Sequence, residues 1–268
     1  MSIKIGQTQI GGPDFTVIAG PCSVESEDQF RTTAIGVKKS GAALLRGGIW
    51  KMRTSPTAFQ GLGESSFEFI KKIKHETGMS LVSEISDIRQ VEKISGFVDA
   101  YQVGARNMHN YSLLKELGQQ DKPVLLKRNF SAYIDEWLKA ADYITNGGNQ
   151  NVILCERGIR TFETAARNTL DLNAVVYAKK HSKFPVIVDP SHAVGIAELV
   201  PHLCYASAAA GADGLIIEVH PNPRVALSDG PQALTLDVFD KMMIQLEKVL
   251  FAFDRKLQKH PNPLNRVS

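Results

Sequence analysis

Four residues spread along the chain carry side chains that commonly bind transition metals. They are a cysteine, a histidine and two carboxylates: Cys22, His192, Glu218 and Asp229. Each lies at the end of a short apolar run or in the loop after one, so the four could converge on one cation if those runs are neighbouring strands. A mixed sulfur, nitrogen and oxygen set suits a catalytic divalent ion such as manganese, iron, cobalt or zinc. Ordinary roles compete, because a lone cysteine packs as a small apolar residue, His192 can cap a helix and Asp229 in "SDGP" can be a turn residue.

A second set of residues at the ends of apolar runs is cationic. It comprises Lys51, Arg53, Arg106, Lys127 and Arg157, with Arg160 as a sixth candidate, although Arg128 and Arg160 fit a solvated surface equally well. Guanidinium groups bind phosphate bidentately and lysines act as compact charges, so this set predicts a substrate with more than one anionic group. The stretch "RGGIWKMRTSPTAF" (46–59), rich in basic residues, glycine and hydroxyls, is interpreted as a phosphate loop.

These residues need a scaffold that brings the ends of distant segments together. Eight apolar, β-branched runs alternate with segments of helical spacing, one of which covers 161–181; the runs are 15–20, 42–46, 80–84, 98–103, 123–127, 151–155, 185–189 and 213–219. Continuous apolar strands alternating with helices predict a parallel sheet, and eight such units fit a (β/α)8 TIM barrel, an α/β fold. A doubly wound open sheet is the alternative, but no G-x-G-x-x-G follows the first strand. In a barrel the strand ends share one face, where active sites of this fold lie.

The two ends of the chain carry different patterns. Residues 1–14 alternate like a short hairpin that could close the barrel floor, and residues 255–268 read as a loose tail. We find no interior linker, so we expect a single barrel domain over 1–268 with no separate regulatory domain.

Composition excludes several classes of protein. The 268 residues are 43% hydrophobic and 22% charged, with 31 basic and 28 acidic residues for a net charge of +3, so the chain lacks the basic field of a general nucleic-acid binder. No leader or membrane-spanning run is evident, and three widely spaced cysteines favour reduced thiols. We therefore expect a cytoplasmic protein without nucleic-acid or membrane partners.

Several segments closely resemble the family of 3-deoxy-D-arabino-heptulosonate 7-phosphate (DAHP) synthases, type I beta. The matching segments, in order between residues 15 and 235, are "IAGPCSVES", "LLRGGIWKMRTSPTAFQGLG", "QVGARNM", "PVLLKR", "NVILCERGIRTFE", "VIVDPSHAVG", "GADGLIIEVHPNP" and "ALSDGPQAL". The resemblance implies the first step of the shikimate pathway of aromatic amino acid biosynthesis. In that reaction phosphoenolpyruvate condenses with erythrose 4-phosphate and water, giving the heptulosonate phosphate and inorganic phosphate. It also implies a divalent ion, manganese above all, on Cys22, His192, Glu218 and Asp229, and a dimer or tetramer.

The resemblance further implies roles for individual residues. Phosphoenolpyruvate would lie among Arg106, Lys127 and Arg157, with Lys51 near the join of the two substrates; the full substrate-binding set is Arg46, Lys51, Arg53, Thr54, Ser55, Arg106, Lys127 and Arg157. The implied catalytic residues are Lys51, Glu84, Lys127 and His192, where Lys127 or a metal-bound water handles a proton and Glu84 orients either. Met52 stands where the family usually carries a proline, within the motif for erythrose 4-phosphate. Because proline stiffens a loop, Met52 could loosen the aldose-phosphate site or adapt it to a different aldose.

Three rival functions remain. The sister enzyme that makes 3-deoxy-D-manno-octulosonate 8-phosphate typically carries an Ala-Asn-Arg-Ser-Ser loop, whereas this chain has "KMRTS" and "GAR", which favours the heptulosonate enzyme. A Schiff-base aldolase on the same fold would use Lys127 as its nucleophile. A barrel that binds a phosphorylated metabolite without turnover is the third.

Overall fold

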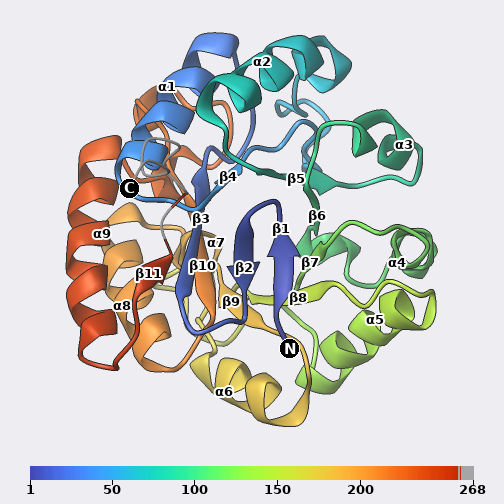
Figure 1. Cartoon of the computed structure of the whole chain (residues 1–268), viewed down its shortest axis with the longest axis vertical. Coiled ribbons are helices and arrows are strands. Elements are labelled where there is room, and N and C mark those ends of the chain that lie inside the picture. Colours follow the sequence, from blue (N-terminus) through green and yellow to red (C-terminus); the bar gives the residue numbers. More distant parts are fainter. Residues whose placement is uncertain (259, 261–268) are drawn as a thin grey trace, which may run out of the picture.

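The computed structural model describes residues 1–258 and 260, and its centre is a closed barrel of eight parallel strands (Figure 1). The strands are β3 (Phe15–Gly20), β4 (Leu44–Arg46), β5 (Leu81–Ile85), β6 (Ala100–Val103), β7 (Val124–Lys127), β8 (Val152–Glu156), β9 (Val186–Val188) and β10 (Gly214–Glu218). Each pairs with the next along the chain, and β10 returns to β3 with Gly214 opposite Thr16. All eight predicted runs form these strands, so the predicted barrel is confirmed.

Helices surround the barrel (Figure 1). They are α1 (Glu27–Lys39), α2 (Phe67–Thr77), α3 (Arg89–Ser95), α4 (Tyr111–Gly118), α5 (Ile134–Asn146), α6 (Leu172–His181), α7 (Pro190–Val194), α8 (Val200–Ala209) and α9 (Leu236–Phe251). Among the described residues, no helix is long and apolar enough to cross a membrane.

Helix α6 is shorter than the sequence pattern predicts. The helical segment expected over 161–181 begins only at Leu172, because the Asp171 side chain accepts a hydrogen bond from the Ala174 N–H and caps the helix there. The residues before it form a loop, closed by an isolated bridge between Ile159 and Thr169. The expectation of a continuous helix was therefore wrong. The residues between β8 and α6 instead form a loop at the mouth of the barrel.

Strand residues alternate between two apolar layers. One set faces the helices, and the other fills the barrel interior with Ile18, Leu44, Val82, Leu125, Ile153, Ile187 and Ile216. The predicted hairpin is present as β1 (Ile3–Ile5) and β2 (Thr8–Ile10), which pair antiparallel. Its side chains Ile3, Ile5 and Ile10 are at most 1% exposed and join the interior layer. Thr8 donates to the carbonyl of Ala43, just before β4, so the hairpin closes the end of the barrel at which the strands begin.

The start of the predicted C-terminal tail is packed against the barrel. Leu257–Gln258 form β11, which pairs parallel with β3, and the Arg255 guanidinium lies 5.1 Å from the centroid of the Phe15 ring. The rest of the predicted tail, residues 259 and 261–268, lies outside the described residues.

Candidate active site

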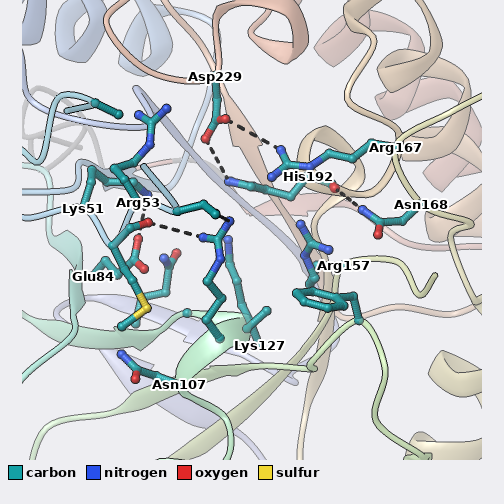
Figure 2. A pocket seen from close by; sticks show the side chains of 18 of the residues that line it. Lys51, Arg53, Glu84, Asn107, Lys127, Arg157, Arg167, Asn168, His192 and Asp229 are labelled. Atoms are coloured by element: carbon teal, nitrogen blue, oxygen red, sulfur yellow. Dashed lines mark hydrogen bonds and ion pairs between the residues drawn. The ribbon is translucent and has the colours of Figure 1, made fainter. Parts of the chain in front are cut away.

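The carboxyl ends of the strands surround a polar cavity of about 430 Å³. Strand residues Glu84, Gln102 and Lys127 line it, together with side chains from the loops after the strands (Figure 2). Most of the predicted site residues line this cavity: Lys51, Arg53, Thr54, Ser55, Glu84, Arg106, Lys127, Arg157, His192 and Asp229. These residues, predicted to lie at the strand ends, therefore line one continuous cavity.

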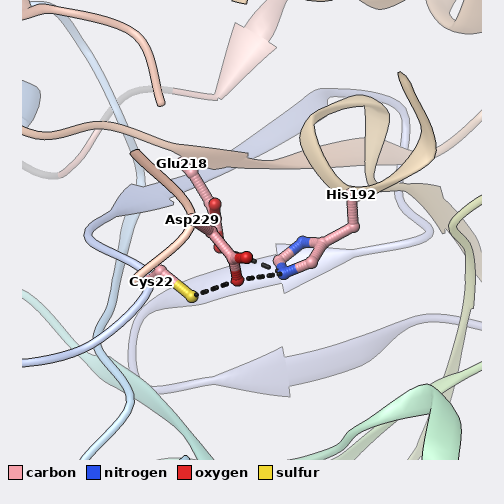
Figure 3. Close-up of side chains that lie close together, drawn as sticks. All are labelled: Cys22, His192, Glu218 and Asp229. Carbon is pink, nitrogen blue, oxygen red and sulfur yellow. Dashed lines mark hydrogen bonds and ion pairs between the residues drawn. The ribbon is translucent and has the colours of Figure 1, made fainter. Parts of the chain in front are cut away.

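Beside the cavity, the four residues expected to bind a metal come together. The ligand atoms of Cys22, His192, Glu218 and Asp229 all lie within 4.8 Å of one another. They come from four separate places in the chain: the loop after β3, helix α7, the last residue of β10 and the loop that follows β10. Figure 3 shows the four side chains pointing toward one another. Only the closed barrel makes residues so distant in sequence neighbours in space.

Asp189 fixes the orientation of His192. It caps α7, with Oδ1 accepting from the His192 backbone N–H at 2.9 Å, while its Oδ2 lies 2.7 Å from the imidazole Nδ1. The remaining nitrogen, Nε2, faces Glu218 Oε1 at 3.1 Å. Burial lowers the pKa of His192, and the opposing effects of Asp189 and Glu218 do not reverse it. The ring is therefore neutral, with Nε2 available as a metal ligand.

Cys22 and Asp229 form the other side of the cluster. The Cys22 Sγ donates to Asp229 Oδ2 at 3.1 Å. Burial, reinforced by the charge of Glu218, raises the pKa of the Cys22 thiol well above its usual range. Burial alone would raise the pKa of Asp229 as well, but His192 and the Cys22 hydrogen bond outweigh it and lower that pKa. Asp229 also adopts a left-handed backbone conformation with φ 48°, which aspartate tolerates better than most residues.

The cluster has the donor chemistry that a divalent ion requires. Glu218 Oε1 is fully buried and has no hydrogen-bond partner among the described residues, although the Arg46 guanidinium lies 3.2 Å from it as an ion pair. A buried carboxylate needs positive charge around it, and a divalent ion between the four ligand atoms would add to the charge that Arg46 supplies. With a thiol, a neutral imidazole and a second carboxylate beside it, this oxygen completes a ligand set suited to manganese, iron, cobalt or zinc.

Lys51 and Glu84 form a buried ion pair at one wall of the cavity. The Lys51 Nζ donates to Glu84 Oε2 at 2.6 Å, with both side chains at most 10% exposed. Burial alone would raise the pKa of Glu84, but the Lys51 charge outweighs it and the pKa is lowered. Gly104 leaves room for this carboxylate, because a Cβ at that position would lie 2.4 Å from Glu84 Oε1.

Lys127, at the end of β7, shares Asp189 with His192. Its Nζ donates to Asp189 Oδ2 at 2.5 Å, and both side chains are almost fully buried. One carboxylate thus holds both a cavity cation and a candidate metal ligand.

Arg157 and Arg53 present donors that no described residue satisfies. Arg157 is 5% exposed, and among the described residues its guanidinium makes no hydrogen bond or ion pair. Burial lowers its pKa, and the nearby charge of Asp189 opposes that shift. The Nη1 of Arg53 is likewise buried without a partner. Buried guanidinium groups without carboxylates are a binding site for anions.

Two arginines near strand ends, Arg46 and Arg128, do not line the cavity. Arg46 is only 2% exposed, does not line the cavity, and lies with Nη2 3.2 Å from Glu218 Oε1. Arg128 is fully engaged within the protein, since its Nη1 donates to Glu156 and Asp171. Arg46 therefore lies against the metal cluster, and Arg128 is structural.

Sequence reasoning missed several residues of the site. Asp189, the last residue of the predicted run 185–189, was given no role, although "DPSH" carries the signature of a helix cap with proline at the first helical position. Gln102, Arg167 and Asn168 also line the cavity, and Gln232 contacts Glu218. Gln102 and Gln232 lie in the segments "QVGARNM" and "ALSDGPQAL", but an amide side chain carries neither charge nor a typical metal ligand, and Arg167 and Asn168 are ordinary residues of a loop.

Comparison with known proteins agrees with this geometry. The model of the DAHP synthetase I family matches residues 1–252. The phospho-2-dehydro-3-deoxyheptonate aldolase of Thermotoga maritima is 46% identical over 255 residues, covering 95% of this chain and 75% of that protein. The 2-dehydro-3-deoxyphosphooctonate aldolase of Geobacter sulfurreducens is 30% identical over 270 residues, covering 92% and 97%.

Solved structures show the same likeness. The crystal structure of the Thermotoga maritima DAHP synthase superposes with a TM-score of 0.93 at 46% identity, covering 96% of this chain and 75% of that one. A truncated form of the Thermotoga maritima enzyme gives a TM-score of 0.89 at 43% identity, covering 96% and 94%. The chain belongs to the DAHP synthetase I family.

Proposed function

We propose that this cavity joins phosphoenolpyruvate to erythrose 4-phosphate beside a divalent ion held by Cys22, His192, Glu218 and Asp229. As a member of its family the chain is a DAHP synthase, which condenses these two substrates and water into DAHP and inorganic phosphate. The observation that carries the assignment of the site is the buried, unpaired guanidinium of Arg157 next to the four-residue cluster. A phosphorylated acid would satisfy that guanidinium.

Phosphoenolpyruvate is assigned to the deeper part of the cavity. Arg157 and Lys127 supply two buried cations there, and Arg106 lies at the edge. Arg106 donates to the Met52 carbonyl at 3.3 Å and to Thr54 Oγ1 at 3.4 Å, so it also touches the loop assigned to the second substrate. Two anionic groups on one small molecule match this spread of charge.

Erythrose 4-phosphate is assigned to the loop after β4. Arg53 offers its unpartnered Nη1 to the phosphate, and the hydroxyls of Thr54 and Ser55 lie on the same cavity wall. Cations on both walls would hold the two substrates in position to react, which removes much of the entropic barrier.

A divalent ion bound to the cluster would supply Lewis-acid polarisation of the aldehyde carbonyl. The protein's own part is to position the reactants. Lys51, anchored by Glu84, places a positive charge between the two anion sites, and Asp189 keeps the Nε2 of His192 free of a proton. Lys127 and the Lys51–Glu84 pair are the candidates for proton handling, since both lie at the cavity wall.

The Schiff-base alternative is disfavoured by the environment of Lys127. A nucleophilic lysine needs a free lone pair, but this Nζ donates to Asp189 in a buried ion pair. The cluster of four metal-type ligands would also have no role in such a mechanism.

Phosphate release from phosphoenolpyruvate tests the proposal. The protein is treated with chelator and then assayed with erythrose 4-phosphate or arabinose 5-phosphate, with and without added Mn²⁺. We expect turnover only with erythrose 4-phosphate and only after Mn²⁺ is restored. Turnover at full rate in chelator would contradict the metal assignment, and turnover with arabinose 5-phosphate alone would contradict the aldose assignment.

The Met52→Pro variant is the companion to this assay. Restoring the residue typical of the family should stiffen the loop and lower KM for erythrose 4-phosphate with little change in kcat. An unchanged KM would show that Met52 is a neutral replacement.

Several broader expectations stay predictions. Cytoplasmic location is supported by Cys22, Cys155 and Cys204, all free thiols in the structure. Manganese as the ion in the cell and a dimer or tetramer are likewise proposed.

A further inference from the structure

We infer that Gln232 is a positioning residue that assigns the two oxygens of Glu218 to different tasks. Its side-chain amide holds Oε2 and leaves Oε1 as the oxygen that binds the ion. The inference rests on the metal site of the proposed function, and it adds a residue outside the four ligands.

The Gln232 amide is held at both of its ends. Gln232 is 3% exposed and ends the short helix η5 (Gly230–Gln232). Its Nε2 donates to Glu218 Oε2 at 2.6 Å, and its Oε1 accepts from Arg167 Nη1 at 2.8 Å. A flipped amide would place its oxygen against the carboxylate and its NH₂ against the guanidinium, so both contacts enforce one orientation.

The two oxygens of Glu218 consequently differ. Oε2 has the Gln232 hydrogen bond, whereas Oε1 has no hydrogen-bond partner among the described residues and faces the cluster, 3.1 Å from His192 Nε2 and 3.2 Å from Arg46 Nη2. An unrestrained carboxylate can rotate and bind an ion through one or both oxygens. Fixing Oε2 on an amide N–H removes that freedom and favours binding through Oε1 alone.

The same segment of chain also supports the Asp229 ligand. The Gln232 backbone N–H donates to the Asp229 carbonyl at 3.2 Å, and the Leu234 N–H donates to the Glu218 carbonyl at 2.9 Å. Gln232 therefore lies between two ligands of the cluster, one bound through its side chain and one through its backbone.

Arg167 extends this arrangement to the substrate cavity. Its guanidinium lines the cavity and lies 3.7 Å from Asp229 Oδ1. Through Gln232, the Arg167 guanidinium at the substrate cavity is therefore connected to Glu218, a ligand of the proposed metal ion.

The test compares Gln232→Met with the unmodified full chain. Methionine has a similar length but no N–H to donate. The dissociation constant for Mn²⁺ is measured on metal-free protein by competition with a chromophoric chelator, and visible absorption is recorded with Co²⁺. We expect Mn²⁺ binding weaker by about 10- to 100-fold and a changed Co²⁺ spectrum, because Glu218 is free to bind through both oxygens.

Asn149→Leu is the matched control. Asn149 is 4% exposed, and its amide donates to the carbonyls of Leu117 and Lys122. These groups lie at the end of the barrel where the strands begin, away from the cluster. This variant should lower the melting temperature of the metal-free protein while leaving the Mn²⁺ dissociation constant within twofold, about the error of the method.

Each outcome decides a different claim. Mn²⁺ affinity and a Co²⁺ spectrum that are unchanged in Gln232→Met would overturn the inference while the metal site stands. Unmodified protein that binds no Mn²⁺ would refute the metal site itself. If Gln232→Met does not fold, Gln232→Asn makes the same test, because its amide is too short to reach Glu218 and remains compatible with a polar pocket.

Discussion

Replacing Asp189 by asparagine should disable the metal site through the histidine that it orients. The carboxylate does three things at once: Oδ1 caps α7 at the His192 N–H, while Oδ2 accepts from both His192 Nδ1 and Lys127 Nζ. Asparagine has a single oxygen. If that oxygen keeps the cap, the amide NH₂ faces Nδ1 and forces the ring proton onto Nε2, the nitrogen that faces the cluster.

The magnitudes follow from the burial of these groups. Asp189 is fully buried and the Lys127 side chain is 4% exposed, so removing the negative charge leaves a buried ammonium without its partner. That loss costs about 3 kcal/mol of unfolding free energy, or roughly 10 °C in melting temperature for a chain of this size. The misdirected imidazole should weaken Mn²⁺ binding by about 10- to 100-fold.

Asp171→Asn is the control for this experiment. Asp171 also caps a helix and is ion-paired, to Arg128 at 2.9 Å, but it does not touch the cluster. Thermal unfolding and chelator competition on both variants separate stability from metal affinity. We expect both to be destabilised and only Asp189→Asn to lose Mn²⁺ affinity. Equal Mn²⁺ affinity in the two variants would refute the claim that Asp189 orients His192.

Three further predictions concern other parts of the molecule. Because burial keeps the Cys22 thiol protonated, Mn²⁺ binding should release about one proton, and the affinity for Mn²⁺ should rise about tenfold per pH unit. Calorimetry in buffers of different ionisation enthalpy counts the protons released, and a count of zero would contradict this prediction. Lys51→Met should lower kcat by about 100-fold or more. In the unmodified protein the lowered pKa of Glu84 stabilises the fold at pH values above the pKa of this group in the unfolded chain. Without Lys51, burial should raise the pKa of Glu84 in the folded protein, so the unfolding free energy should instead fall as the pH rises through that raised pKa. Denaturant unfolding at a series of pH values gives the sign. Ile5→Ala should lower the unfolding free energy by about 2 to 5 kcal/mol, because Ile5 is buried in the barrel interior. The kcat at low temperature should not change, because the hairpin lies at the end of the barrel opposite the cavity. A fall in kcat that accompanies the loss of stability would contradict this prediction.

The barrel was predictable because its signal is repeated and local. Each strand is a short apolar run buried on both faces, and the eight runs recur at regular intervals with helical segments between them. The start of α6 was not predictable in the same way, because "TAARNTLDLNAVVY" is compatible with helix throughout. The Asp171 cap and the bridge of Ile159 to Thr169 decide it, and both depend on the folded chain.

The convergence of the site residues followed from the barrel, but their partners did not. Once strand ends share one face, residue types alone suggest a metal cluster and an anion cavity. Which cations stay free for substrate depends on the pairing of side chains in the folded chain. Within the described part of the chain Arg157 has no partner, whereas Arg128, also just after a strand, is bound to Glu156 and Asp171. Gln232 acquires its position only when η5 packs against the end of β10.

Diffraction from crystals soaked with Mn²⁺ and phosphoenolpyruvate would show directly whether the four-residue cluster binds the ion and Arg157 binds the phosphate. We expect one anomalous peak bounded by Cys22 Sγ, His192 Nε2, Glu218 Oε1 and Asp229, with the phosphoenolpyruvate phosphate on Arg157. An ion or a phosphate bound elsewhere in the barrel, with this cluster unchanged, would contradict this expectation.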